Sequence, residues 1–183
     1  MTNLWDSERS FNMSQNEALK YINSGNENLS KDNFDQAIVD FTKALELNPN
    51  DANVYYYRGL AHYGISVMRN DAPSIDRAIG DYNQALKLNP DYVEVYNARS
   101  GAYFGKNEFD KAIEDINHVI QLGTNDSFAY ATRGVAYMMK EEFDRAIKDL
   151  ETSLRMNPDQ PDIRQHLEMA RIMQKNPIQK NPM

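Results

Sequence analysis

The segment from Phe34 to Phe41, which reads FDQAIVDF, decides the fold because the chain repeats it three more times. The other copies read IDRAIGDY at 75–82, FDKAIEDI at 109–116 and FDRAIKDL at 143–150. Their equivalent alanines are 41, 34 and 34 residues apart, at Ala37, Ala78, Ala112 and Ala146. A period of about 34 residues is typical of helix-turn-helix repeats. The chain is therefore predicted to be all-α, a solenoid of four repeated helix pairs.

Composition narrows the range of functions. The chain has 183 residues, a net charge of -7 and no cysteine. Nucleic-acid binding is disfavoured, because phosphate contacts need clustered Lys and Arg, and the basic residues here are scattered among acids. No long apolar run and no signal-peptide pattern is visible, so we expect no membrane span and a cytoplasmic location. The lack of cysteine excludes disulfides and thiolate sites.

The fourth repeat shows why each copy should form two helices. Apolar and small residues recur at intervals of three and four, first from Tyr130 to Tyr137 and then from Phe143 to Leu154. Pro disfavours a helical residue before it, and a following Asp or Asn can cap the next helix. Such turns are predicted at Asn48-Pro49, Asn89-Pro90 and Asn157-Pro158, whereas the third repeat has Gly123-Thr124 at this place.

Small residues recur on the first helix of each pair. Gly costs about 1 kcal/mol in a helix interior relative to Ala, so its recurrence indicates a packing requirement that outweighs helix propensity. We expect the paired helices to approach closely at these positions, which are Gly25, Gly59, Ser100 and Gly134.

These residues resemble the signature of the tetratricopeptide repeat (TPR) family, which is an aromatic residue, Gly, Tyr, Ala, an apolar residue, Ala and Pro. The fourth repeat matches at nearly every place, with Tyr130, Gly134, Tyr137, Ala146, Leu150, Ser153 and Pro158. The departures from the signature are Asn28 and His62 in the column of Tyr103 and Tyr137, Val119 and Ser153 in the column of Ala44 and Ala85, and Thr124 for Pro. The resemblance implies a right-handed superhelix of antiparallel helix pairs, with the first helices lining a concave face.

The repeats divide the chain into an extension at 1–17, TPR-like repeats at about 18–51, 52–92, 93–126 and 127–160, a capping helix at 161–175 and a flexible tail at 176–183. The second repeat holds seven extra residues. We expect them to lengthen its first helix and to carry Ile65 and Met68 beyond the edge of the array. A neutral insertion is favoured over a binding role.

No residue pattern indicates catalysis, a cofactor or a metal. His62, His118 and His166 lie in different repeats, and none has a ligand-like partner three or four residues away. Neither a glycine-rich phosphate loop nor a nucleophile elbow is present. The many carboxylates are interpreted as solvated helix faces. We therefore expect no enzyme activity, no cofactor and no metal site.

Arg and Asp recur in register, with Arg58, Arg99 and Arg133 in first helices and Asp40, Asp81, Asp115 and Asp149 in second helices. The first repeat has Ser24 in the Arg column. We predict that each Asp pairs with the Arg of the next repeat, because the missing Arg then falls where no repeat precedes it. The predicted pairs are Asp40 with Arg58, Asp81 with Arg99 and Asp115 with Arg133. The alternative is that the arginines bind an anionic ligand.

In the superhelix that the resemblance implies, the inward face is mainly apolar and aromatic, with Asn amides between. The candidate groove residues are Ile22, Asn26, Asn53, Tyr56, Leu60, Tyr63, Asn97, Phe104, Phe128, Val135 and Met138. Some TPR domains bind a peptide carboxylate with Lys and Arg in these columns. Here the matching places hold Ile22, Tyr57, Glu94 and Ala98, and only Asn26 agrees. A carboxylate clamp is thus disfavoured.

An apolar groove with aromatic anchors favours an amphipathic helix or an extended apolar segment of a protein or peptide as the partner. We therefore expect a non-catalytic interaction module. Two alternatives stay open at this point. In the first, the groove is covered by the region around Trp5, by the tail or by a second copy of the chain. In the second, the groove and the end faces bind copies of the chain and build a homo-oligomeric scaffold.

Overall fold

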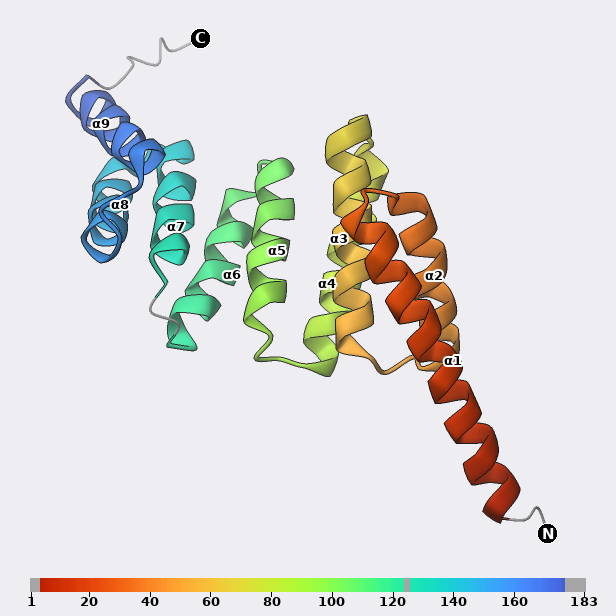
Figure 1. Ribbon diagram of the computed structural model, residues 1–183. Coiled ribbons are helices and arrows are strands. Elements are labelled where there is room, and N and C mark those ends of the chain that lie inside the picture. Colours follow the sequence, from red (N-terminus) through yellow and green to blue (C-terminus); the bar gives the residue numbers. More distant parts are fainter. Residues whose placement is uncertain (1–3, 124–125, 177–183) are drawn as a thin grey trace. The chain divides into compact units, whose positions relative to one another are not determined.

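The structure is a computed structural model that describes the backbone of residues 4–123 and 126–176 and the side chains of residues 13–123 and 126–176. Within these ranges the chain forms nine α-helices and no β-strand (Figure 1). They are α1 (Leu4–Ser30), α2 (Phe34–Leu47), α3 (Ala52–Arg69), α4 (Ala72–Leu88), α5 (Val93–Gly105), α6 (Phe109–Gln121), α7 (Ser127–Met139), α8 (Phe143–Met156) and α9 (Pro161–Lys175). The predicted all-α class of repeated helix pairs is confirmed.

The helices pack as two compact units, Met1–Ala98 and Arg99–Met183, called unit 1 and unit 2 below. In unit 1, α1 packs on α2, α2 on α3 and α3 on α4. In unit 2, α6 packs on α7, α7 on α8 and α8 on α9. The second helices α2 and α8 are therefore each covered by their own first helix and by the helix that follows.

Short polar residues mark the helix ends. Asp51 caps α3 by accepting hydrogen bonds from the backbone N–H groups of Asn53 and Val54, and Asp126 caps α7 in the same way through Phe128. These caps satisfy N–H groups that have no partner within the helix. The turn inside each pair passes through one residue with a left-handed backbone, at Asp32, Asn70, Asn107 and Glu141.

Close approach of the paired helices explains the small residues of the first helices. A Cβ atom at Gly59 would lie 2.6 Å from the ring of Tyr82, and one at Gly134 would lie 2.8 Å from Cγ of Leu150. Tyr82 and Leu150 are fully buried. No side chain fits in these gaps, so the predicted packing requirement is confirmed.

The extra residues of the second repeat lengthen both of its helices. α3 has 18 residues and α4 has 17, against 13 in α7 and 14 in α8. The added turn of α3 packs on the start of α2, where Phe34 lies against Gly64 and Asp35 pairs with Arg69 at 2.6 Å. The prediction that Ile65 extends beyond the array is therefore wrong, because this residue is buried. Only the tip with Met68 is exposed.

The two ends of the chain differ. α1 runs without a break from the predicted extension into the first repeat, and its first half projects past α2 (Figure 1). α9 packs on α8 and buries Leu167 and Ala170, while Ile172 points to solvent. The side chains of Trp5 and Phe11 and the tail at 177–183 lie outside the described residues, so the predictions for them stay untested.

Candidate partner-binding face

The Arg–Asp pairs of unit 2 join the two helices of one repeat. Arg133 donates Nε and Nη2 to the two carboxylate oxygens of Asp149, at 2.6 and 2.9 Å. Arg99 binds Asp115 in the same bidentate way, at 2.9 and 2.6 Å. Both carboxylates are buried. The predicted pair of Asp115 with Arg133 is therefore wrong.

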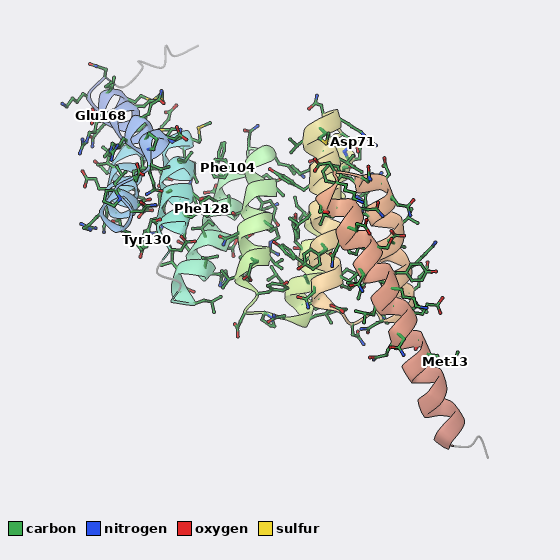
Figure 2. The ribbon with its side chains drawn as sticks, in the orientation of Figure 1. Met13, Asp71, Phe104, Phe128, Tyr130 and Glu168 are labelled. Carbon is green, nitrogen blue, oxygen red and sulfur yellow. The ribbon has the colours of Figure 1, made fainter. Side chains whose placement is uncertain are left out.

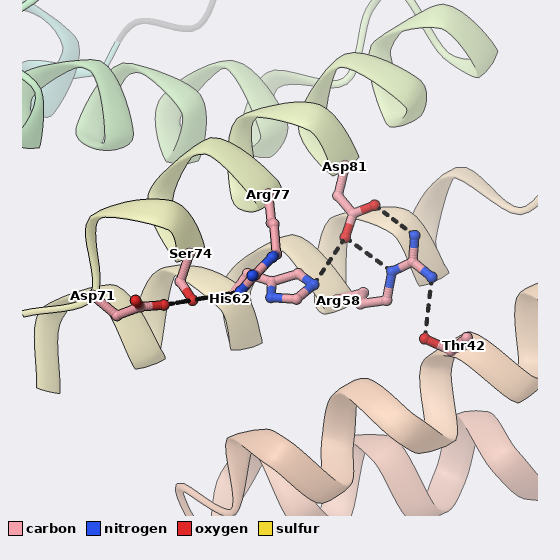
Figure 3. A network of polar contacts seen from close by, with 7 residues as sticks. All are labelled: Thr42, Arg58, His62, Asp71, Ser74, Arg77 and Asp81. Carbon is pink, nitrogen blue, oxygen red and sulfur yellow. Dashed lines mark hydrogen bonds and ion pairs between the residues drawn. The ribbon is translucent and has the colours of Figure 1, made fainter. Parts of the chain in front are cut away.

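In unit 1, too, the Arg binds the Asp of its own repeat. Arg58 donates Nε and Nη2 to Asp81 at 2.9 and 2.7 Å (Figure 3). The predicted pairs of Asp40 with Arg58 and of Asp81 with Arg99 are thus also wrong, because these arginines bind the Asp of their own repeat.

The third guanidinium nitrogen explains why the Arg column starts only at the second repeat. Arg58 Nη1 donates to Oγ1 of Thr42 at 3.2 Å, and Arg133 Nη1 donates to Oδ1 of Asn117 at 2.7 Å. Thr42 and Asn117 both lie in the second helix of the preceding repeat. These arginines therefore link their own Asp to the previous helix pair, and this second link was missed from the sequence.

In the first repeat, neutral side chains replace the Arg. Asp40 is buried, yet it accepts hydrogen bonds from Ser24 Oγ at 2.7 Å, Asn28 Nδ2 at 3.0 Å and Gln36 Nε2 at 3.0 Å. A buried carboxylate needs such donors to offset its lost hydration. Ser24 and Asn28, both departures from the repeat pattern, thus act together.

The electrostatics of these sites are those of buried ion pairs. Hydrogen bonds to Asp81 and Asp149 raise the pKa of Arg58 and of Arg133, respectively. Burial raises the pKa of the Asp115 carboxyl, because the bonds from Arg99 offset only part of the lost hydration. Since these guanidinium groups are bonded to protein side chains, the alternative of an anion-binding site is not favoured.

His62 lies beside the pair in the second repeat. Its Nε2 is 4.0 Å from Oδ2 of Asp81, on the side away from Thr42 (Figure 3). Burial lowers the pKa of His62, and Asp81 opposes this effect while Arg58 adds to it. Nδ1 of His62 is buried and has no hydrogen-bond partner among the described residues.

The first-helix face of unit 1 carries seven of the candidate groove residues. All of them are at least partly exposed, namely Ile22, Asn26, Asn53, Tyr56, Leu60, Tyr63 and Asn97. Ile22 also packs against the apolar core that includes Phe41 and Val54. Leu19, one turn earlier in α1, is 54 % exposed.

An aromatic cluster forms at the start of α3. The ring centroid of Tyr56 lies 5.3 Å from that of Tyr57, 6.4 Å from that of Tyr82 and 5.4 Å from that of Tyr92. Tyr92 lies in the turn between α4 and α5 and donates its hydroxyl to Oδ1 of Asn53 at 2.7 Å. The cluster thus joins a candidate groove residue of α3 to the turn that leads into the next repeat.

Sequence reasoning missed Tyr92, although a signal was present. Residue 92 follows Asp51 by 41 positions and precedes Asp126 by 34, so it falls in the column that supplies helix caps. Asp at that place accepts backbone N–H groups in α3 and α7, and a tyrosine cannot do so in the same way. An aromatic residue in a capping column indicates a role other than capping.

In unit 2, the candidate residues separate into exposed and buried groups. Phe128, at the start of α7, is 57 % exposed, and Phe104 of α5 is partly exposed with its ring edge-on to Phe109 at 5.3 Å (Figure 2). Val135 is partly buried. Met138 is buried in a core shared with Leu167 of α9, so its assignment to a groove is wrong.

Across residues with described side chains, His, Asp and Glu form no group of three that could bind a metal ion. None of the helices in the described ranges combines the length and the apolar character that crossing a membrane requires.

Family models match most of the repeat region. A TPR repeat model matches residues 25–65, and two tetratricopeptide repeat models match residues 74–127 and 127–160. A comparison with curated proteins gives no match.

Solved structures of similar fold include a MamA fragment, 41-end, from Desulfovibrio magneticus RS-1. It has a TM-score of 0.78 and 19 % identity, over 87 % of this chain and 86 % of that one. A crystal structure of MamA protein has the same TM-score at 24 % identity, over 87 % of this chain and 83 % of that one. PilF of Pseudomonas aeruginosa has a TM-score of 0.72 and 20 % identity, over 88 % and 71 %. At these identities the likeness shows the fold, and together with the three family models and the repeated helix pairs it establishes that the chain belongs to the tetratricopeptide repeat family.

Proposed function

We propose that the chain is a non-catalytic interaction module that holds an apolar helical or extended segment of a partner protein against the first-helix faces of its repeats. The TPR fold generally serves as an interaction module, and this supports the broader part of the proposal. The observation that carries the finer part is the exposure of apolar side chains on these faces. Phe128 and Leu19 are each more than half exposed, and Tyr56 and Tyr63 are partly exposed.

Aromatic residues on such a face are suited to bind another protein. Each offers a large and rigid contact area, so little conformational entropy is lost when a partner covers it. Central aromatic anchors of an interface can contribute about 2 kcal/mol or more each. Phe128 in unit 2 and Tyr56 in unit 1 are the strongest candidates for such anchors.

The Arg–Asp geometry supports an apolar partner over an acidic one. The regularly spaced guanidinium groups that could have bound a carboxylate are bonded to Asp81, Asp115 and Asp149. The described side chains of the first helices form no regular column of unpaired cations, so we expect recognition through apolar burial.

The proposal is tested with peptides selected from a random library on the immobilised protein. Their Kd values are measured by fluorescence anisotropy with wild type and with Tyr56→Ala/Phe128→Ala. We expect binding to weaken at least about tenfold, because hot-spot truncations cost about 2 kcal/mol or more. Phe128→Ala alone is the safer variant, since its exposed ring contributes little to folding.

The matched control is Val39→Ala/Ile172→Ala, which removes two exposed apolar side chains from α2 and α9. We expect the control to bind the peptides as wild type does, and circular dichroism verifies that all variants fold. An unchanged Kd in the folded Tyr56→Ala/Phe128→Ala variant, with weaker binding in the control, would place the binding surface on the other helices.

A second candidate is a homo-oligomeric scaffold. The observation that favours it is an exposed apolar strip on α9, formed by Met169 and Ile172, together with the exposed Met13 on the projecting part of α1. Light scattering at several protein concentrations separates the two functions. A mass that rises with concentration in wild type and falls to one chain in Met169→Ser/Ile172→Ser would favour the scaffold.

A further inference from the structure

The aromatic cluster around Tyr56 has an acidic border. Glu94 occupies the first turn of α5 and is exposed, two residues after Tyr92. Asp51, the capping residue of α3, lies two residues before Asn53, which accepts the Tyr92 hydroxyl. Figure 1 shows that the start of α3 and the turn after α4 lie at the same end of unit 1.

Both carboxylates act on the aromatic cluster. Burial raises the pKa of Tyr56, and the negative charge of Glu94 raises it further. Burial and the neighbouring tyrosines raise the pKa of Tyr92 to about 12, with Glu94 and Asp51 as the charged groups that contribute. The field at these phenols is therefore negative, and it favours a cation near the rings.

Unit 1 as a whole is also negatively charged. Residues 1–98 contain 14 Asp and Glu against 8 Lys and Arg, a net charge of -6, whereas residues 99–183 contain 13 against 12, a net charge of -1. Nearly all of the chain's net charge of -7 thus belongs to the unit that holds the cluster. A cationic partner segment is attracted to this unit more than to the other.

The fold does not account for the charge of Glu94. Among the described residues it has no hydrogen-bond or ion-pair partner, unlike Glu27 and Glu108, which pair with lysines. Tyr92, in turn, occupies the column where Asp caps the helices α3 and α7. The second repeat therefore exchanges a capping residue for an aromatic one beside an unpaired carboxylate.

We propose that Tyr56 and Tyr92, with Glu94, form a subsite for a Lys or Arg side chain of the partner segment. The cation would lie against the partly exposed tyrosine rings, whose faces are electron-rich, while Glu94 neutralises its charge. This inference rests on the proposed function, because the same face of α3 holds the apolar part of the segment. It adds that the partner is basic in the part that contacts unit 1.

The test uses peptides selected from a random library on the wild-type protein, synthesised with their basic residues intact or replaced by Gln. Kd values are measured with wild type, Glu94→Gln and Tyr56→Leu. The matched control is Glu46→Gln, which removes an exposed carboxylate from α2 of the same unit. We expect the selected peptides to be rich in Lys and Arg, and Glu94→Gln to weaken binding about fivefold, while Glu46→Gln changes it less than about twofold.

Salt separates the contact at Glu94 from general attraction. Raising the salt from about 0.1 M to about 1 M shortens the Debye length from about 10 Å to about 3 Å. The effect of Glu94→Gln should therefore shrink but persist, whereas any effect of Glu46→Gln should vanish. Gln-substituted peptides should bind wild type and Glu94→Gln equally.

Three outcomes would overturn the subsite. They are selected peptides without a basic excess, a Kd that Glu94→Gln leaves unchanged, or equal effects of Glu94→Gln and Glu46→Gln. In each of these cases the wider proposal survives provided that Phe128→Ala or Tyr56→Leu still weakens peptide binding. Loss of the subsite for a Lys or Arg side chain is therefore distinguishable from loss of the apolar face.

Discussion

Ser24 in the first repeat and Leu167 in the closing helix occupy the place where the repeats between them have Arg. Residue 24 precedes Arg58 by 34 positions, and residue 167 follows Arg133 by 34. The first repeat has an Asp of its own, and no helix pair precedes α1 among the described residues. Ser24 and Asn28, with Gln36, bind Asp40 there. The closing helix α9 follows a helix pair, but no second helix follows it among the described residues, and it buries Leu167 in place of an Arg.

The comparison shows which partners an Arg at this position needs. A guanidinium buried without a carboxylate would lose its hydration with nothing in exchange, so the closing helix has an apolar residue. Within the part of the chain that the structure describes, an Arg in the first repeat would have a carboxylate but no counterpart of Thr42 or Asn117 for its third nitrogen. Arg58 and Arg133 therefore occur where they bond both the Asp of their own repeat and a polar side chain of the preceding repeat.

The two ends of the array also differ in the helices that cover them. α3 covers the far side of α2 and α9 covers the far side of α8, whereas no second helix precedes α1 among the described residues. Repeat arrays need such closing elements because each repeat buries its apolar face against the next.

Removal of the closing helix should have the largest effect. Deleting residues 161–183 would expose Leu150 and Met138, which lie in the core shared with Leu167, and each is worth about 1.5–3 kcal/mol when fully buried. Hydrogen exchange should show lost protection in α7 and α8, with α2 and α3 of unit 1 less affected. Deletion of 177–183 alone is the control. Full protection of residues 130–154 in the shorter chain would contradict a capping role for α9.

Breaking an Arg–Asp pair should have the next largest effect. Arg133→Met leaves the Asp149 side chain, only 7 % exposed, without its cation, so we expect a loss of about 3–5 kcal/mol in urea unfolding at neutral pH. Arg155→Met, on the exposed side of α8, should change stability by about 0.5 kcal/mol or less.

A double-mutant cycle identifies the partner of Arg133. The coupling free energy between Arg133 and Asp149 should be clearly above zero, while that between Arg133 and Asp115 should be near zero. Adding Asp149→Leu to Arg133→Met should also recover much of the lost stability, because the uncompensated charge is gone. Strong coupling of Arg133 to Asp115 would restore the next-repeat scheme.

Ser24→Ala should have a smaller effect than Arg133→Met. Asp40 would keep its bonds from Asn28 and Gln36, so we expect a loss of about 1–2 kcal/mol in the free energy of unfolding. Ser30→Ala, which removes an exposed hydroxyl bonded to the carbonyl of Glu27, is the matched control. Equal effects of the two substitutions would show that Ser24 does not replace the Arg.

The smallest effect concerns the pH dependence of the second repeat, where His62 lies beside Asp81. Burial lowers the pKa of folded His62, while the unfolded value is about 6.5. The unfolded state therefore takes up the proton first as the pH falls, and stability should decrease as the pH falls through the unfolded value and below it. His62→Tyr, which introduces the residue found at 103 and 137, should remove this part of the pH dependence.

Urea unfolding at several pH values measures the effect. His118→Tyr changes an exposed histidine of α6 and is the control. If His118→Tyr removes as much of the pH dependence as His62→Tyr does, the buried histidine is not the titrating group.

Much of the fold could be predicted from the sequence because each repeat contacts only its neighbours. The spacing of the alanines and of the Asn-Pro turns predicted the helix pairs, and Gly59 and Gly134 predicted their close approach. These features depend on local periodicity and on contacts within one pair, which a single sequence records directly.

The pairing of Arg with Asp was decided only by the tertiary structure. Asp115 is 16 residues from Arg99 and 18 from Arg133, and a regular repeat makes both distances equally regular in sequence. The direction in which each side chain leaves its helix selects the first partner.

Packing between helices also decided which candidate groove residues are exposed. Met138 has the same place in its helix as Tyr63 and Phe104 in theirs, yet α9 buries it. Ile65 is buried because the extra turn of α3 packs on α2. The ring of Tyr92, in the turn between α4 and α5, packs near the ring of Tyr56 in α3. The sequence determined the periodic faces of this protein, and the tertiary structure decided which residues of those faces stay open, because burial depends on the neighbouring helix.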